Sequence, residues 1–170
     1  MDGRHREPTP RAITPIRVTD HMSAHVLVAV DGSEESRHAL EHAFELPGVD
    51  VTAITVVDPF DVDPLTPGLQ SPLGQAGIPA YSQEWYQKQW DNAHDLHEEL
   101  RERAASFDGE FDSVVKLGKP SREILQYADE HEIDQIVIGA ASDDTLSHVL
   151  LGSTAKRVTQ RAPVTVTVVR

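Results

Sequence analysis

Two glycines near the end of the chain lie where backbone amides can bind an anion. Gly139 follows an apolar, strand-like run, and Gly152 precedes residues 154–161, whose pattern predicts a helix. Glycines at a strand-to-helix connection let backbone N–H groups approach a phosphate, which the positive end of the helix dipole also attracts. The spacing of Gly139, Gly152 and Ser153 therefore indicates a site for a nucleotide or another anion.

Ser142 stands where we expect a third glycine in this pattern. If the position needs a positive φ, serine costs about 1–2 kcal/mol there. Its Cβ would also crowd a phosphate, although its hydroxyl can donate a hydrogen bond. Asp143 and Asp144 follow, and each carboxylate would cost about 1 kcal/mol at about 4 Å from a phosphate in a water-like dielectric. Molar salt would screen much of this repulsion, and a bound Mg²⁺ would make the aspartates ligands.

Two further carboxylates, Asp31 and Asp58, each follow a predicted strand. The carboxyl ends of parallel strands meet at one edge of a sheet, so both aspartates should converge there with Gly118 and Gly139. Response regulators also pair such aspartates around Mg²⁺, but that design requires an acceptor aspartate where this chain has Gly118. Because of these two aspartates, an enzyme that hydrolyses or transfers phosphate remains an open alternative for the function. Ser33 is expected to cap a helix, because no histidine is placed to make it a nucleophile.

Four histidines are paired at helical spacing, which can place two ligands on one metal ion. The pairs are His38 with His42 and His94 with His97, and each falls within an acidic, helix-like segment. The sequence fixes no third ligand beside either pair. We therefore predict that all four histidines lie at the surface and that they form no metal site.

Alternating strand-like and helix-like segments must position these residues. Short apolar runs predict strands at 25–30, 51–57, 113–117, 135–138 and 164–169. Helical periodicity predicts helices at 34–46, 81–107, 120–127 and 154–161. Strands that alternate with helices pair in parallel through right-handed crossovers, which predicts a three-layer α/β fold with an open parallel five-stranded sheet. In such sheets ligands bind beyond the carboxyl ends of the strands, where the strand order reverses.

The chain of 170 residues fits one domain, which we assign to residues 24–170. Residues 1–23 carry three prolines and no periodicity, which predicts a disordered tail and makes Met22 an alternative translation start. Residues 59–80 hold five prolines and three glycines, which predicts a long irregular loop.

The composition excludes several classes of protein. The net charge is −13, with 28 acidic against 15 basic residues, and such a charge repels nucleic acid and anionic membrane surfaces. The absence of cysteine excludes disulfides and thiolate metal sites. No apolar run approaches the roughly 20 residues of a membrane span or resembles a signal sequence, so we expect a cytoplasmic protein. The strong acidity favours a salt-rich, halophile-like cytosol.

Four short segments, in order along the chain, resemble the universal stress protein family. They are residues 28–33, 56–58, 118–120 and 139–153. The family motif is glycine, two residues, glycine, nine residues, glycine and then serine or threonine, and its spacing is matched at 139, 142, 152 and 153. The resemblance covers residues 24–170 and implies a Rossmann-like fold of the adenine nucleotide α-hydrolase type, with strand order 3-2-1-4-5.

The resemblance implies a site for ATP, with Mg²⁺ as the accompanying ion. Asp31 and the backbone at Val56 would bind the adenine and ribose end, and the glycine block would bind phosphates and ribose. The residues that we predict for nucleotide binding are Ala29, Asp31, Val56, Gly139, Ser142, Gly152 and Ser153. Members of the family commonly form homodimers by antiparallel pairing of their last strands, here residues 164–169.

Besides the enzyme suggested by Asp31 and Asp58, two functions of different kinds remain open for such a chain. One is a stress-response sensor or regulator that binds ATP and at most hydrolyses it slowly, so that it is not primarily an enzyme. The other is an interaction module that has lost nucleotide binding, because family members without ATP binding lack parts of the motif and Ser142 is such a departure. Neither function involves nucleic acid or a membrane as the partner.

Overall fold

The computed structural model describes residues 23–59, 83–140 and 151–170, in which strands and α-helices alternate. The strands are β1 (Ala24–Ala29), β2 (Val49–Val57), β3 (Phe111–Leu117), β4 (Gln135–Gly139) and β5 (Thr165–Val169). The helices are α1 (Glu34–Glu45), α2 (Gln83–Arg103), α3 (Pro120–Glu130) and α4 (Ser153–Arg161). The predicted tail and the predicted proline-rich loop lie outside the described residues, except for Ser23 and Pro59.

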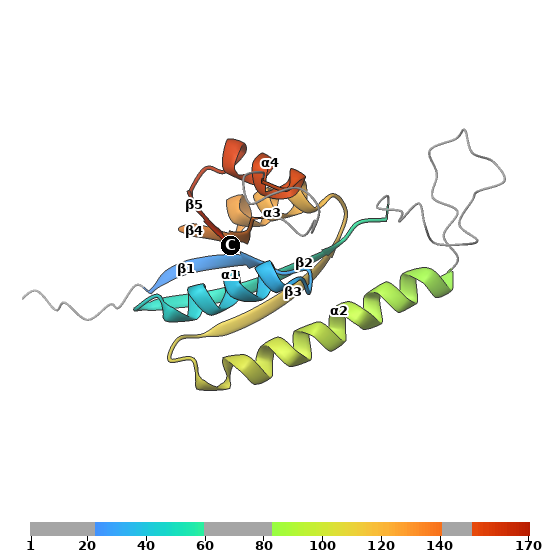
Figure 1. Ribbon diagram of the computed structural model, residues 1–170, viewed down its shortest axis with the longest axis horizontal. Coiled ribbons are helices and arrows are strands. Elements are labelled where there is room, and N and C mark those ends of the chain that lie inside the picture. Colours follow the sequence, from blue (N-terminus) through green and yellow to red (C-terminus); the bar gives the residue numbers. More distant parts are fainter. Residues whose placement is uncertain (1–22, 60–82, 141–150) are drawn as a thin grey trace, which may run out of the picture.

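The five strands form one parallel sheet in the order β3-β2-β1-β4-β5, which confirms the predicted topology. Figure 1 shows α1 and α2 on one face of the sheet and α3 and α4 on the other. The central strand β1 pairs with β2 on one side, where Val26 lies opposite Val51, and with β4 on the other. The carboxyl end of β1 is therefore the point where the strand order reverses, and a ligand crevice is expected there.

Each face of the sheet carries its own apolar layer. The layer under α1 and α2 includes the buried side chains of Val26, Val28, Leu40 and Leu100. The layer under α3 and α4 includes the buried side chains of Leu27, Ile54, Ile124 and Val158. Successive residues of β1 thus enter opposite layers, as expected for a strand that is covered on both faces.

The observed elements differ from the predicted ones mainly at polar residues. β2 begins two residues earlier than predicted and includes Asp50, whose carboxylate accepts hydrogen bonds from the Ser23 hydroxyl and from the Glu110 amide. The Ser23 bond, followed by the Glu110 bond, lowers the pKa of Asp50 below its ordinary value. A polar residue is therefore stable in the strand, and the apolar pattern alone could not include it.

Helix α2 is long, and over residues 86–103 one stripe of it is buried. It spans 21 residues and extends past the end of the sheet in Figure 1, and a 3₁₀ turn, Ala104–Ser106, follows it. Within residues 86–103, its buried side chains are Ala93, His97 and Leu100. Neither α2 nor any other helix in the described ranges has both the length and the apolar character that crossing a membrane requires.

Candidate functional site

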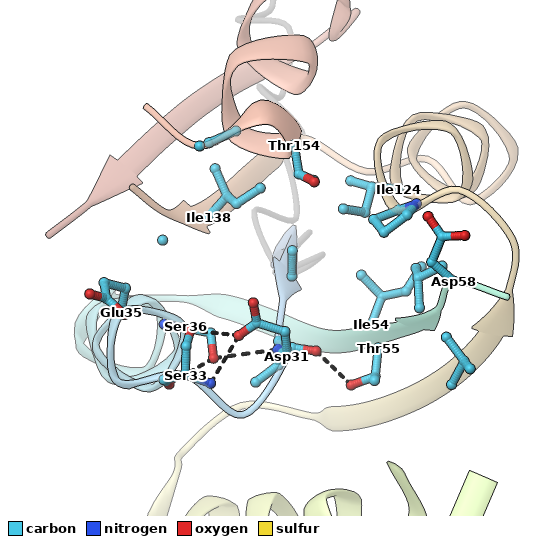
Figure 2. Close-up of a pocket in the computed structure, with 18 of the residues that line it drawn as sticks. Asp31, Ser33, Glu35, Ser36, Ile54, Thr55, Asp58, Ile124, Ile138 and Thr154 are labelled. Atoms are coloured by element: carbon cyan, nitrogen blue, oxygen red, sulfur yellow. Dashed lines mark hydrogen bonds between the residues drawn. The ribbon is translucent and has the colours of Figure 1, made fainter. Parts of the chain in front are cut away.

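A pocket of about 870 Å³ opens at the carboxyl ends of β1, β2 and β4, a volume typical of small-molecule sites. Figure 2 shows side chains of α1, β2, α3, β4 and α4 around this pocket. The pocket is lined by six of the seven residues predicted for nucleotide binding, which are Ala29, Asp31, Val56, Gly139, Gly152 and Ser153. The seventh, Ser142, lies outside the described residues.

The turn after β1 fixes the carboxylate of Asp31 at the pocket. Gly32 in this turn has a φ of +86°, a conformation that favours glycine. Oδ1 of Asp31 accepts hydrogen bonds from the Ser33 amide at 2.9 Å and from the Ser33 hydroxyl at 2.5 Å (Figure 2). The Ser33 hydroxyl in turn accepts from the Ser36 amide at 3.2 Å, which confirms Ser33 as the N-cap of α1. The capping residue therefore also orients Asp31.

Another wall of the pocket contains the first turn of α4. The amide of Gly152, the N-cap residue, donates to the carbonyl of Ala140 at 2.7 Å, and the Ala140 amide donates to the carbonyl of Val169 at 2.7 Å. These bonds join the ends of β4 and β5 to the start of α4. The first turn of α4 carries no acidic residue and no side-chain cap, so its amides present partial positive charge.

Gly139 has a packing role that the sequence did not indicate. A Cβ built on Gly139 would lie 2.8 Å from the carbonyl carbon of Glu35 and 2.9 Å from its Cβ, so any larger residue would clash with α1. The spacing of the glycine motif predicts that this glycine also admits a phosphate. Its contact with Glu35 also lets α1 approach the end of β4, at the edge where Glu35 and Gly139 both line the pocket.

Several residues in the pocket wall were not predicted from the sequence. They include Glu35, Ser36, Gln89, Asn92, Leu96, Pro120, Ile124, Ile138 and Thr154. Ile124 and Ile138 are typical core residues by their pattern, and both are indeed buried. Position was the signal that could have identified some of them, because Ile138 lies near the carboxyl end of a strand and Thr154 lies in the first turn of a helix.

Charge is distributed unevenly around the pocket. Asp31, Glu35 and Asp58 place carboxylates beside α1 and the end of β2 (Figure 2). The first turn of α4 contributes Ser153 and Thr154, two residues with hydroxyl groups. The described lining residues include no lysine, arginine or histidine. The arrangement fits a ligand with hydroxyl or amino donors at one end and a negative group at the other, a combination that a nucleotide has.

His97 corrects the prediction that all four paired histidines lie at the surface. Its side chain is 2% exposed, and its Nε2 lies 2.9 Å from the hydroxyl of Thr55. Burial, with a smaller contribution from Arg101, lowers the pKa of His97 from 6.5 to about 4. His97 belongs to the same helical stripe as Leu100, and this spacing was the signal that could have identified it.

Two of the other paired histidines, His38 and His94, lie at the surface as predicted. His38 is exposed and approaches Glu34 at 4.0 Å, and His94 is exposed beside Trp90, with 5.5 Å between the ring centroids. In the parts of the chain that the structure describes, no three histidine, aspartate or glutamate side chains gather closely enough to hold a metal ion. Asp143 and Asp144 lie outside those parts.

An open parallel sheet with a pocket at its switch point and a helix N-terminus in the pocket wall defines the nucleotide-binding type of α/β fold. A model of the universal stress protein family matches residues 22–170. The chain therefore belongs to the universal stress protein family, and the resemblance seen in its sequence is confirmed.

Relatives match most of the chain. The universal stress protein MJ0531 of Methanocaldococcus jannaschii is 27% identical over 166 residues, which cover 91% of this chain and 86% of the relative. The structure of the universal stress protein UspA from Lactobacillus plantarum is 28% identical, with a TM-score of 0.69, and covers 87% of this chain and 98% of that chain. A universal stress protein from Archaeoglobus fulgidus, in complex with dAMP, shares the fold at 21% identity and a TM-score of 0.56, covering 86% of this chain and 98% of that one.

Proposed function

We propose that this universal stress protein binds an adenine nucleotide, ATP together with Mg²⁺, in the pocket at the carboxyl ends of β1, β2 and β4. The observation that carries the proposal is the geometry of this pocket, in which Asp31 and the first turn of α4 border one space of about 870 Å³. The complex of the Archaeoglobus fulgidus protein with dAMP supports the choice of an adenine nucleotide.

The charge distribution of the pocket suggests the orientation of the nucleotide. Asp31 accepts hydrogen bonds from the ribose hydroxyls or the adenine amino group, near Ala29 and the backbone of Val56. The phosphates bind beside Gly152 and Ser153, where the dipole of α4 and the first-turn amides that begin at Ser153 favour negative charge, since the Gly152 amide itself donates to Ala140. Gly139 and Ser142 complete this phosphate end of the proposed site, and Mg²⁺ offsets the repulsion between phosphates and nearby carboxylates.

The role that we propose is that of a stress-response sensor or regulator in the cytoplasm, with at most slow hydrolysis of ATP. Efficient phosphoryl transfer depends on cations that neutralise the charge developing on the phosphates. The described lining residues contribute no cationic side chain to this task. With Mg²⁺ but no cationic side chain from the described lining residues to neutralise this charge, we expect the bound nucleotide to turn over slowly.

Isothermal titration calorimetry with ATP and Mg²⁺ in molar KCl tests the proposal directly. We expect saturable binding, weakened roughly tenfold by Asp31→Asn, because a charged hydrogen-bond acceptor is lost. Asp108→Asn is the matched control, since Asp108 is exposed and lies just before β3 at the opposite edge of the sheet. No binding heat at millimolar ATP would exclude the proposed function.

A second candidate is an interaction module of the same family that binds no nucleotide. The observation that favours it is Ser142, which replaces a glycine of the family motif and is followed by two aspartates. This alternative predicts protein that is purified without nucleotide and a Ser142→Gly variant that gains ATP binding. Mass spectrometry of small molecules released from the purified wild-type protein decides the question, because a co-purified adenine nucleotide would exclude the alternative.

The proposal includes a homodimer formed by antiparallel pairing of β5 with its counterpart in a second chain. β5 is an edge strand of the described sheet, so alternate backbone amides and carbonyls along it face away from β4. Such an edge is a template for a further strand, and a second copy of the same strand can satisfy its hydrogen bonds by two-fold symmetry.

A further inference from the structure

A chain of three buried polar groups lies beside the pocket and links α2, β2 and the end of β1. Nε2 of His97 lies 2.9 Å from Oγ1 of Thr55, and this hydroxyl donates to the carbonyl oxygen of Val30 at 2.7 Å. His97 and Thr55 are 2% and 7% exposed. Thr55 and Val30 also line the pocket, so the chain runs from the interior of the protein to the wall of the proposed site (Figure 2).

Hydrogen-bonding capacity determines which nitrogen of His97 carries the proton. The Val30 carbonyl can only accept, so the single hydroxyl proton of Thr55 is committed to it. Thr55 therefore has only acceptor capacity left for His97, and Nε2 of the imidazole must donate. The arrangement therefore requires the tautomer of His97 that is protonated on Nε2.

The Thr55 hydroxyl takes the place of the next backbone hydrogen bond between β1 and β2. The Val30 amide donates to the carbonyl of Ile54 at 2.9 Å, which is the last backbone bond between these segments. The carbonyl of Val30, the next acceptor in a parallel ladder, receives the Thr55 hydroxyl instead. The Gly118 amide donates to the carbonyl of Val57, so the backbone of Val57 faces β3. The backbone of Val56 therefore faces the β1 side, and Val56 lines the pocket there.

We propose that His97 is a positioning residue for the nucleotide site, acting through Thr55 to set the direction of the peptide between Val30 and Asp31 and to keep the Val56 amide available to the ligand. This inference rests on the proposed function, because it names how the walls of that same pocket are held. His97 does not touch the pocket itself, and its effect passes through a hydroxyl whose only proton is fixed at Val30.

The surroundings of His97 keep the hydrogen bonds from His97 through Thr55 to Val30 intact at neutral pH. Burial is the first cause that lowers its pKa to about 4, and Arg101 and His94 on the same helix are the next causes. On the side of β2 it meets the uncharged Thr55, and the Arg101 guanidinium bonds the hydroxyl of Ser113 on β3. The charged groups with which α1 faces α2 form the ion pairs Arg37–Glu99 and Glu41–Arg103.

The sheet contains a matched pair that serves as the control. The hydroxyl of Thr52, also on β2, lies 2.8 Å from Nε2 of His25, and Thr52 is 2% exposed. This second threonine–histidine pair lies nearer the amino end of β2, and neither residue lines the pocket. Thr52→Val therefore removes a buried hydroxyl from the same strand but leaves the hydrogen bonds of His97, Thr55 and Val30 unchanged.

Nitrogen-15 NMR of the histidine rings tests the tautomer without any nucleotide. We expect His97 to be neutral, protonated on Nε2, from about pH 8 down to about pH 5, and the Thr55→Val variant to lose this fixed tautomer. The amide resonances of Asp31 and Val56 should shift in Thr55→Val and stay in place in Thr52→Val. An imidazole protonated on Nδ1, or unchanged Asp31 and Val56 resonances in Thr55→Val, would overturn the proposal.

Calorimetry with ATP and Mg²⁺ measures the consequence for binding. Thr55→Val and His97→Leu should each weaken binding roughly tenfold, and the double variant no further, because both substitutions break one chain. Thr55→Ser, which keeps the hydroxyl, should restore most of the affinity. Wild-type affinity in Thr55→Val, or an equal loss in Thr52→Val, would contradict the positioning role. If wild type binds no ATP, the proposed function fails, and the NMR result alone then decides whether His97 positions this wall.

Discussion

At the scale of single residues, His97 makes the stability of the protein depend on pH. Burial lowers its pKa from 6.5, the value for an exposed histidine, to about 4 in the folded protein. Folding therefore favours the neutral imidazole. The contribution of His97 to the stability of the protein is fully present above about pH 6.5 and is lost as the pH falls from there towards 4. We expect this group to lower the free energy of unfolding by up to about 3 kcal/mol across that window.

Urea unfolding of wild type and of His97→Gln at about pH 7 and about pH 4.5 measures this dependence. The variant should be less stable than wild type at the higher pH, because it loses the buried bond to Thr55, yet it should lose less stability on acidification. His38→Gln is the matched control, since His38 is exposed, and it should behave as wild type does. Equal losses in wild type and His97→Gln would contradict the assignment.

Residues whose partners are local could be predicted from the sequence, and residues whose partners are distant could not. Ser33 caps α1 and binds Asp31 two residues away, so turn chemistry was enough to identify its role. His97 and Thr55 are 42 residues apart, and their pairing exists only because α2 packs across β2. Helical spacing marks the buried stripe of α2, but it does not state which strand atom the stripe meets.

At the scale of elements, the close approach of α1 to β4 depends on Gly139. A Cβ at this position would come within 2.8 Å of the Glu35 backbone, and the helix would have to move away from the strand. We expect Gly139→Ala to lower the free energy of unfolding by about 1–3 kcal/mol, as overpacking typically does. Ser153→Ala, at an exposed position of the same pocket, is the control and should change stability by less.

Chemical unfolding monitored by circular dichroism measures the effect of Gly139→Ala. Wild-type stability in this variant would show that α1 and β4 can separate without cost. A drop in stability together with retained ATP binding would assign Gly139 to packing alone, and loss of both would assign it to packing and phosphate approach together.

The order and direction of the elements could be predicted because strands and helices alternate regularly along the chain. That alternation also placed the carboxyl ends of β1, β2 and β4 together, and hence Asp31 near Gly139 and Gly152. The boundaries were less certain at the start of β2, where Asp50 lies in the strand because distant partners satisfy its carboxylate. Ser142 could be identified from the motif, but it lies outside the residues that the structure describes.

At the scale of the whole molecule, the open edge of β5 makes the proposed homodimer testable. The Ala140 amide bonds the carbonyl of Val169, so alternation places the amide of Val166 on the edge that faces away from β4. Val166→Pro removes this donor and should convert the dimer to a monomer, as measured by size-exclusion chromatography with light scattering. Val166→Thr keeps the amide and should remain dimeric. A dimeric Val166→Pro variant would place the interface elsewhere.

The net charge of −13 should make the protein dependent on salt. Raising the ionic strength from 0.1 M to 1 M shortens the Debye length from about 10 Å to about 3 Å, which screens repulsion between surface carboxylates. We expect the melting temperature to rise with KCl over this range, as measured by circular dichroism. A triple variant of exposed α2 residues, Asp95→Asn, Glu98→Gln and Glu102→Gln, should need less salt to reach the same value. A melting temperature that is independent of KCl would exclude adaptation to a salt-rich cytosol.

The common direction of the five strands has a practical consequence for labelling. β1 begins at Ala24, at the end of the sheet far from the pocket, whereas β5 ends at Val169, whose carbonyl accepts a hydrogen bond from the Ala140 amide beside the pocket. A fluorescent reporter fused after Arg170 would stand close to the pocket mouth and respond to its occupancy. A purification handle joined directly to the start of β1 would be attached a full strand length from the pocket.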